Sequence, residues 1–330
     1  MEGRVLQPVR RRRRRGQRRR LRLSLVLLVV LIALGVGVVV RGRHKSHAAA
    51  ARAPAPALEP AALPAAVRAR ERRPRLVFGP AVVRSRFALA APTGIVIDAR
   101  SGRVLWARRP HERRLVASTT KIMTALLALR RLRPHDLVTV PPEAPRVPLV
   151  REGLRTGERV QAWKLFYGLL LYSGNDDALA LAVAVGGTKR RFIDEMNAEA
   201  KRLGLRDTHF ASTSGVIDDR NYSSVWDLAA LTRVAMRNVR FRSIVRRRRV
   251  EVPWSAPTFA KVYVNKNRLL SLYAGATGVK TGYTQRSGPC IVASATRRGV
   301  PLIAVVLDSP NEYVDAARLL SLGFRTASPA

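Results

Sequence analysis

The segment from Ala117 to Leu129, ASTTKIMTALLAL, places a serine and a lysine three residues apart at the start of an apolar run. In a helix, residues i and i+3 share one face, so the Ser118 hydroxyl and the Lys121 amine can touch. A neutral lysine there can deprotonate the hydroxyl and make it a nucleophile. The structural alternative is that Ser118 caps the helix and Lys121 is solvated. A lone S-x-x-K motif favours this alternative, so further residues have to decide between the two interpretations.

Two other short motifs carry side chains of the same kinds. An S-x-N motif occupies residues 173–175 within YSGND, and a K-T-G motif occupies residues 280–282 within GVKTGYT. Each motif is weak alone, because S-x-N is common by chance and K-T-G can simply begin a strand. Ser173 follows Ser118 by 55 residues, and Lys280 follows Ser173 by 107 residues. This order of motifs is the one that serine acyl-transferases of the penicillin-binding class use.

On these motifs the chain resembles the low-molecular-mass penicillin-binding proteins, the serine-type D-alanyl-D-alanine carboxypeptidases. Other stretches are similar to this family as well: STTKIMTALLAL, SGNDDALALA, MNAEAKRLGLRDTHF, NRLL and GATGVKTGYTQRSGPCIVASA. The resemblance covers roughly residues 87–324. It departs at residues 211–216, where ASTSGV stands in place of the family's usual Asn-Pro-x-Gly-Leu-like stretch. The role of that loop is therefore open.

The resemblance implies a catalytic group of three side chains. Ser118 attacks the carbonyl carbon of the penultimate D-alanine, Lys121 is its base, and Ser173 relays the proton to the leaving amine. Lys121 acts as a base only when it is neutral, which requires a lowered pKa. Burial and a second cation both lower the pKa of a lysine, and Lys280 is the expected second cation.

The resemblance also implies the residues that bind the substrate. Asn175 hydrogen-bonds the substrate or positions the base, while Lys280 and Thr281 bind the terminal carboxylate. Gly282 has no side chain, so its strand can approach the substrate backbone closely. The backbone N–H of Tyr283, together with that of the nucleophile, forms the oxyanion hole.

The implied reaction is removal of the terminal D-alanine from peptidoglycan pentapeptides through an acyl-enzyme, with β-lactam antibiotics as covalent inhibitors. Neither a cofactor nor a metal is expected. The histidines show no metal-ligand spacing such as H-E-x-x-H and are interpreted as structural or surface residues; they are His44, His47, His111, His135 and His209. Asp176 and Asp177 are not expected to act as an acid–base pair, because adjacent side chains on a helix point apart. A cap or an ion pair is the expected role of Asp177.

Three alternatives to this function stay open. A class A β-lactamase shares the motifs but needs a glutamate that activates the deacylating water, and no E-x-x-L-N stretch is recognisable between the second and third motifs. A D,D-endopeptidase would use the same site on cross-linked peptides. A non-enzymatic, cationic wall-binding protein is supported by the charge and disfavoured by the three intact motifs.

The net charge of the chain is +39, which suggests an anionic partner. Its densest run is RRRRRRGQRRRLR at residues 10–22, and a second run, RRRR, occupies residues 246–249. The sequence has no zinc-finger cysteines and no P-loop, so no specific nucleic-acid binding is expected. Cys290 is the only cysteine; it excludes an intrachain disulfide and is predicted to be a small buried residue.

The N-terminal quarter is predicted to attach the enzyme to a membrane. Residues 1–22 form a basic cytoplasmic segment, and residues 23–40, LSLVLLVVLIALGVGVVV, are apolar and uncharged like a membrane span. The preceding arginines place the catalytic region outside the cytoplasm. A cleaved signal peptide is the alternative, with AAAA at residues 48–51 as the peptidase site. Residues 41–75 form an Ala/Pro-rich linker, and residues 76–330 form the catalytic domain.

The elements that must position these residues come from both ends of the folded region. A hairpin is predicted over residues 93–107 and two strands joined at Arg298-Gly299 near the C-terminus. Helices are predicted after Ser118 and over residues 192–205, 225–239 and 311–324. Such a pattern predicts an α/β fold of the α+β type, an antiparallel sheet flanked by helices with a mostly helical insertion, β-lactamase/transpeptidase-like.

Overall fold

A computed structural model describes residues 74–78, 87–216, 220–254 and 260–327. The predicted basic segment at residues 1–22, the anchor at 23–40 and nearly all of the linker at 41–75 lie outside these ranges. Within the described part of the chain, no helix has both the length and the apolar character needed to cross a membrane.

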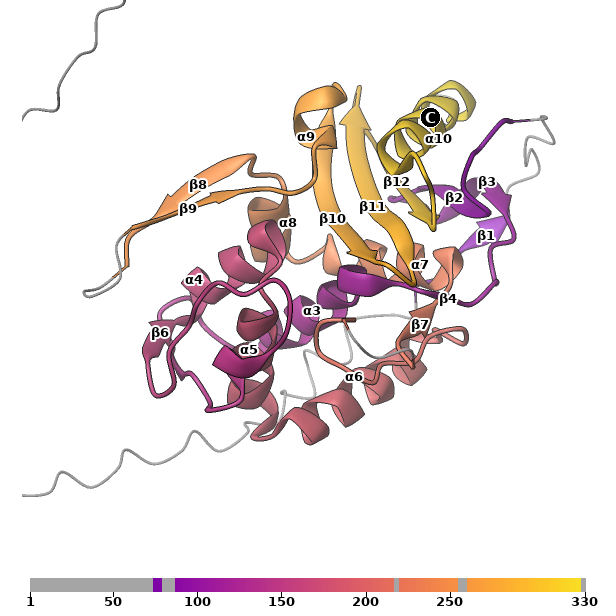
Figure 1. The fold of residues 1–330 in the computed structure, drawn as a ribbon. Helices are drawn as coiled ribbons and strands as arrows, with labels where there is room; N and C mark the ends of the chain where they lie inside the picture. The colour runs from indigo at the N-terminus through magenta and orange to yellow at the C-terminus, as the bar shows by residue number, and fades with distance from the viewer. Residues whose placement is uncertain (1–73, 79–86, 217–219, 255–259, 328–330) are drawn as a thin grey trace, which may run out of the picture. The chain divides into compact units, whose positions relative to one another are not determined.

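Six strands form the main sheet, in the order β1-β3-β2-β12-β11-β10 (Figure 1). Their bounds are β1 Val77–Phe78, β2 Thr93–Asp98, β3 Arg103–Arg108, β10 Ala276–Thr284, β11 Gly288–Arg297 and β12 Val300–Leu307. All neighbours are antiparallel except β1 and β3. The predicted antiparallel sheet is confirmed, and the parallel edge strand β1 is an exception. Its two residues are too few to produce a periodic signal in the sequence.

Three two-stranded sheets and a set of helices complete the described fold. The small sheets pair β4 (Arg114–Leu115) with β7 (Tyr222–Ser223), β5 (Leu137–Thr139) with β6 (Arg159–Gln161), and β8 (Arg249–Val252) with β9 (Lys261–Val264). The helices are η1 Ala117–Thr120, α3 Lys121–Arg131, η2 Ala144–Arg146, α4 Ala162–Tyr167, η3 Gly168–Tyr172, α5 Asn175–Gly186, α6 Lys189–Leu203, α7 Val225–Ala235, α8 Val239–Val245, α9 Leu269–Leu272 and α10 Glu312–Thr326.

Helices cover both faces of the sheet. Helix α10 packs on β2, β3, β11 and β12, whereas α7 packs on the other face and α8 packs on β10. The alternation of side chains along each strand divides the buried residues between two cores. On β2, Ile95 and Ile97 enter the larger core, shared with α3, α5 and α7, while Val96 enters the smaller core under α10. The predicted helical insertion is therefore the middle of the chain, between β3 and β10.

Local sequence signals set several boundaries as predicted. The β11–β12 turn is the pair Arg298-Gly299, and both residues have positive φ, as a tight two-residue hairpin turn requires. Helix α6 ends at Gly204 in the left-handed conformation. The helix predicted over residues 225–239 is α7, which ends at Ala235, and a separate helix, α8, begins at Val239. The Asn238 side chain accepts the backbone N–H of Phe241 and thereby starts α8.

A buried ion-pair network ties α3 to α6. Glu199 of α6 accepts hydrogen bonds from Arg130 of α3 at 2.8 Å and from Arg202 at 2.6 Å. Burial alone would raise the pKa of Glu199, but the two guanidinium groups outweigh it and hold this pKa below its ordinary value. Because α3 carries Lys121, the network fixes one end of the catalytic segment.

We predict that Glu199→Gln destabilises the protein by about 3 kcal/mol at pH 7, since it removes the carboxylate charge that the buried Arg130 guanidinium contacts. A carboxylate whose folded pKa is lowered stabilises the fold above its ordinary pKa, and this contribution is lost as the pH falls. The difference in the free energy of unfolding between the parent and the variant, measured in urea, should therefore shrink below about pH 4.5, the ordinary pKa of a glutamate.

Glu195→Gln is the matched control, because the Glu195–Arg131 pair is more exposed. It should change stability by about 0–1 kcal/mol. A Glu199→Gln deficit that is the same at pH 7 and at pH 3.5 would rule out the electrostatic explanation.

Candidate active site

Ser118 and Lys121 meet at the junction of η1 and α3. The Lys121 amine and the Ser118 hydroxyl are 2.8 Å apart, across one turn of helix. The turn before them is tight, with Ala117 at φ 43°. Lys121 is fully buried and Ser118 is 9% exposed, so only the hydroxyl reaches the surface of the site. The contact predicted from the S-x-x-K spacing is present.

The other neighbours of the Lys121 amine are two neutral oxygens. Nζ donates to Asn175 Oδ1 at 2.8 Å and to the backbone carbonyl of Ser214 at 3.3 Å. The Asn175 amide is itself oriented, because its Nδ2 donates to the Pro148 carbonyl at 2.8 Å. A neutral amine has two N–H groups and one lone pair. Two oxygens that only accept and one hydroxyl that can donate match that set of groups.

Burial and two cations lower the pKa of Lys121 well below its usual range. Desolvation is the largest cause, followed by Lys280 and then Lys266, while Asp177 and Asp176 oppose the shift. Lys280 is buried as well, and burial together with Lys266 lowers its pKa to about 7. Lys280, the expected second cation, is among the charges that lower the Lys121 pKa, and Lys266 is a further one that sequence reasoning missed. In the sequence, the only feature that pointed to Lys266 is its position directly before the NRLL stretch.

Strand β10 brings the K-T-G residues against Ser118. A Cβ atom built on Gly282 would lie 2.9 Å from the Ser118 backbone nitrogen and 3.1 Å from the Val116 carbonyl oxygen. Residue 282 must therefore be glycine if the strand is to lie this close. Lys280 Nζ donates to the Thr281 carbonyl at 3.0 Å. Tyr283 follows on the same strand and is 66% exposed.

The S-x-N residues lie where η3 ends and α5 begins. Ser173 is in the left-handed conformation with φ 76°, and its backbone N–H bonds the Gly168 carbonyl at 2.8 Å. This turn places the Asn175 side chain next to Lys121. The Ser173 side chain is buried and is not among the hydrogen-bond partners of Lys121. Its predicted role in proton relay stays a prediction.

The loop at residues 211–216, whose role the sequence left open, encloses the Lys121 amine. Its Ser214 carbonyl contacts Lys121, and its Thr213 carbonyl accepts the Thr124 hydroxyl at 2.6 Å. Gly215 has φ 74°, and a Cβ atom there would lie 1.9 Å from the Ala117 carbonyl oxygen. The loop acts through its backbone, so the identities of its side chains gave no signal of this contact.

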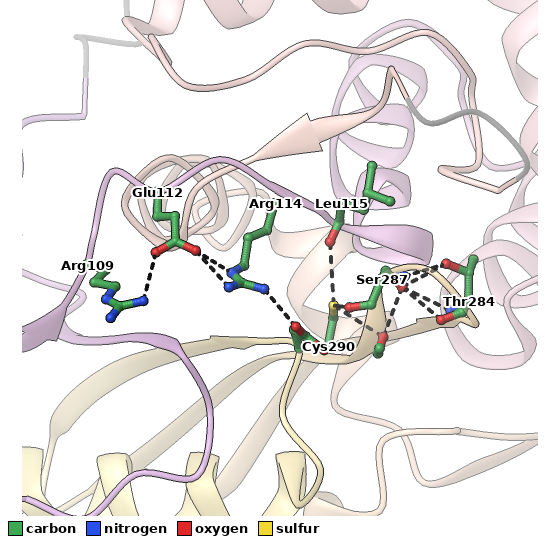
Figure 2. Close-up of polar contacts among 9 residues, drawn as sticks. Arg109, Glu112, Arg114, Leu115, Thr284, Ser287 and Cys290 are labelled. Atoms are coloured by element: carbon green, nitrogen blue, oxygen red, sulfur yellow. Dashed lines mark hydrogen bonds and ion pairs between the residues drawn. The ribbon is translucent and has the colours of Figure 1, made fainter.

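A polar cluster fixes the segment that leads into Ser118 (Figure 2). Arg114 of β4 pairs with Glu112 at 2.7 Å and with Asp308, after β12, at 2.7 Å. Beside it, the Cys290 thiol of β11 contacts the Leu115 carbonyl at 3.8 Å. Cys290 is fully buried as predicted, and burial raises the pKa of its thiol to about 12. The cluster anchors β4 to the main sheet two residues before η1 begins.

Two acidic residues follow the S-x-N motif, and each has its own role in the fold. Asp176 accepts the backbone N–H groups of Glu152, Gly153 and Leu154 at 2.9–3.2 Å, so it holds the preceding loop. Asp177, expected to be a cap or an ion-pair partner, is fully buried beside the Glu152 carboxyl. That expectation is wrong, because neither Asp177 oxygen meets a donor group among the described residues.

The Asp177 and Glu152 carboxyl groups share a narrow space over Gly168. A Cβ atom on that glycine would lie 2.1 Å from Glu152 Oε2 and 2.5 Å from each Asp177 oxygen. Glu152 Oε1 accepts the Tyr263 hydroxyl and, at 3.0 Å, the Lys261 amine. Burial first, and then Glu152 through its charge and a hydrogen bond, raise the pKa of Asp177 well above its usual range. A protonated Asp177 can donate to Glu152 Oε2 and satisfy both groups.

Among the described residues, no group of three or more His, Cys, Asp and Glu side chains could hold a metal ion. The expectation that catalysis needs no metal or cofactor stays a prediction.

Comparison with known proteins gives the site a context. The family of D-alanyl-D-alanine carboxypeptidases matches residues 81–311. The chain is 34% identical to a D-alanyl-D-alanine carboxypeptidase of Streptomyces sp. (strain K15), over 74% of this chain and 91% of that protein. It is 32% identical to the carboxypeptidase DacF of Bacillus subtilis, over 73% of this chain and 64% of that longer protein. The crystal structure of the Streptomyces K15 DD-transpeptidase superposes with a TM-score of 0.69 at 34% identity, covering 73% of this chain and 99% of that one.

We predict that Asp177→Asn stabilises the protein at alkaline pH. An acid whose folded pKa is raised contributes stability that is complete at low pH and is lost as the pH rises through the folded pKa. The asparagine is neutral at every pH and donates to Glu152 in the same place. Its advantage in chemical denaturation should grow between pH 5 and pH 9, toward about 1–3 kcal/mol, which is the cost of a buried polar group without a partner.

Asp176→Asn is the matched control, because it leaves one acceptor oxygen for three backbone N–H groups. It should destabilise the protein across the same pH range. If Asp177→Asn is equally destabilising at pH 5 and pH 9, Asp177 is not protonated in the folded protein.

Proposed function

Because this chain belongs to the D-alanyl-D-alanine carboxypeptidase family, we propose that it removes the terminal D-alanine from peptidoglycan stem pentapeptides through an acyl-enzyme on Ser118. The observation that carries the proposal is the buried Lys121 amine, 2.8 Å from the Ser118 hydroxyl and surrounded by neutral oxygens. That environment favours the unprotonated amine, which is the form that can accept the hydroxyl proton.

In the first step, Ser118 Oγ forms a bond to the carbonyl carbon of the penultimate D-alanine while its proton passes to Lys121. The tetrahedral oxyanion accepts hydrogen bonds from the backbone N–H groups of Ser118 and Tyr283. Donors of this kind are worth about 10²–10³ in rate each. The close approach of Gly282 to the Ser118 nitrogen sets the distance between these two donors.

The bond to the terminal D-alanine then breaks, and its nitrogen takes a proton from Lys121 through the Ser173 hydroxyl. The acyl-enzyme remains on Ser118. In the second step water attacks the ester carbonyl, Lys121 takes one proton of the water, and Ser118 leaves as a hydroxyl. Oxidation states do not change, and one peptide bond is hydrolysed overall.

Lys280 and Thr281 bind the carboxylate of the terminal D-alanine. A carboxylate that enters beside Lys280 favours the charged form of this lysine, whose pKa in the free site is about 7. Substrate binding therefore charges Lys280. The charged Lys280 in turn opposes protonation of Lys121.

The other enzymatic alternatives differ in the acceptor or in the second step. An endopeptidase would release a split cross-linked dimer in place of free D-alanine. A transpeptidase, as the Streptomyces K15 neighbour is named, would pass the acyl group to an amine in place of water. A class A β-lactamase would need a carboxylate to activate water. The three polar partners of Lys121 supply none, so a slowly hydrolysed penicillin adduct is expected.

We further propose that the enzyme acts outside the cytoplasm, held at the membrane by residues 23–40 with residues 41–75 as a spacer. The support is the sequence pattern, an uncharged apolar run preceded by dense arginine. A protein so anchored would reach peptidoglycan from the membrane surface.

We predict that Lys121→Ala abolishes both activities of the site, release of D-alanine from a pentapeptide and acylation of Ser118 by penicillin. General-base catalysis typically contributes about 10²–10⁴ in rate, so a loss of at least 100-fold is expected. D-alanine release is followed by chromatography, and the adduct by intact mass and peptide mapping.

Lys201→Ala, which removes an exposed lysine on α6, should leave both rates unchanged. The proposal fails if penicillin labels a residue other than Ser118, or if Lys121→Ala keeps an acylation rate within about tenfold of the parent, a barrier change of about 1.4 kcal/mol.

We predict that Lys280→Ala moves the acidic limb of the pH–rate profile to higher pH, in addition to weakening carboxylate binding. The sign follows from the charges: a protonated Lys280 lowers the pKa of Lys121, so its removal raises that pKa and the neutral base forms only at higher pH. The rate of acylation by a fluorescent penicillin, measured from pH 5 to pH 10, gives the position of this acidic limb.

Lys266→Met is the graded control. Lys266 lowers the pKa of Lys121 less than Lys280 does, so this variant should move the limb in the same direction by a smaller amount. A limb that stays in place in both variants would show that burial alone keeps the base neutral.

A further inference from the structure

A cavity of about 550 Å³ lies between the sheet and the ends of α7 and α8. Its volume is in the range of small-molecule sites. Thr277, on its wall, is five residues from Gly282 along β10, which corresponds to roughly 17 Å of extended strand. The cavity is therefore separate from the Ser118 site, at the opposite end of the same strand.

Five arginines and no acidic residue line this cavity; they are Arg100, Arg233, Arg237, Arg242 and Arg246. The two smaller cavities, of about 370 and 320 Å³, each have two basic residues in their lining. We call the five residues the arginine rim. The rim therefore gathers more positive charge at one cavity than either of these two smaller cavities does.

The arginine rim has only neutral partners. Arg233 donates to the carbonyls of Ala99 at 2.9 Å and Arg100 at 2.7 Å, and Arg242 donates to that of Met236 at 2.8 Å. Within the described ranges, no rim arginine forms an ion pair with a carboxylate. Among the described residues, Asp98 acts on Arg233 only through its charge, and no direct ion pair neutralises the rim.

The interior of the cavity is suited to a different part of a ligand. Apolar side chains line it, among them Met236, Val239 and Ile303. The Thr277 and Ser294 hydroxyls, 2.8 Å apart, add one polar point on the strands. An occupant must then combine an anionic group for the rim with an apolar body for the interior.

We propose that this cavity binds an organic phosphate, with the phosphate on the arginine rim and its apolar part against Met236, Val239 and Ile303. Guanidinium groups bind phosphate oxygens in a bidentate manner. Burial and the neighbouring Arg237 already lower the pKa of Arg233, and a bound anion relieves this repulsion. The shared chemistry fits both a free phosphate monoester and the phosphodiester of a lipid headgroup or wall polymer.

The test is calorimetric titration of the full chain with three probes: phenyl phosphate, methyl phenyl phosphate and inorganic phosphate. At least one of the two phenyl esters should bind at least tenfold more tightly than inorganic phosphate, because only they carry an apolar group. Tighter binding of phenyl phosphate would identify a monoester ligand, and tighter binding of methyl phenyl phosphate a phosphodiester. Lys280→Ala should keep the binding, which excludes the catalytic lysine as the phosphate site.

The double variant Arg237→Gln/Arg246→Gln should weaken ester binding at least tenfold. Arg318→Gln/Arg325→Gln is the matched control: it removes the same charge from the 320 Å³ cavity and should leave the affinity unchanged. No binding of either ester, or an equal loss in the two double variants, would overturn the proposal and leave the rim as solvated surface charge.

Discussion

The arrangement of this site depends on one interaction, the contact between a fully buried lysine amine and a serine hydroxyl. Among the described residues, no carboxylate is in contact with that amine. Burying a cation without a counter-ion is unfavourable, and the protein avoids that cost when the amine is neutral. Three separate segments create the condition. Helix α5 supplies the Asn175 oxygen, the loop at residues 211–216 supplies the Ser214 carbonyl, and β10 closes the site through Gly282. Each of these contacts involves a neutral group, so none restores a charge to the lysine.

The electrostatic surroundings act in two opposing directions. Lys280 and Lys266 keep the base neutral, while Asp176 and Asp177 favour its protonation. Asp176 is committed to three backbone N–H groups. Asp177 is buried against Glu152, which favours its neutral form. When Asp177 is neutral, one of the two negative charges that favour the protonated form of Lys121 is absent. The acidic pair beneath the S-x-N turn therefore helps to set the charge of the base above it.

Sequence reasoning reached the reactive residues because their chemistry depends on side-chain type and on short spacing. Ser118 and Lys121 share a helical turn, and the K-T-G strand needed glycine for contact. The β2–β3 hairpin, the β11–β12 pair and the helices α3, α6, α7 and α10 followed from β-branched runs, caps and turn residues. What it missed depends on the tertiary structure. The Ser214 carbonyl acts through its backbone, Lys266 lies in an ordinary-looking loop, and the Glu152–Asp177 pair joins residues that no periodicity connects. The two-residue strand β1 and the break between α7 and α8 were likewise decided by packing and a single cap.

The most direct measurement of the central claim is the ionisation of Lys121 in the resting enzyme. Lysine labelled with ¹³C at Cε reports its charge by NMR, and comparison with Lys121→Arg assigns the signal. If the buried amine is the base, Lys121 titrates well below 10.5, the ordinary pKa of lysine, and is neutral where the enzyme is active. A Lys121 signal that titrates near that ordinary value would show a charged lysine in the resting site and would contradict its role as the base.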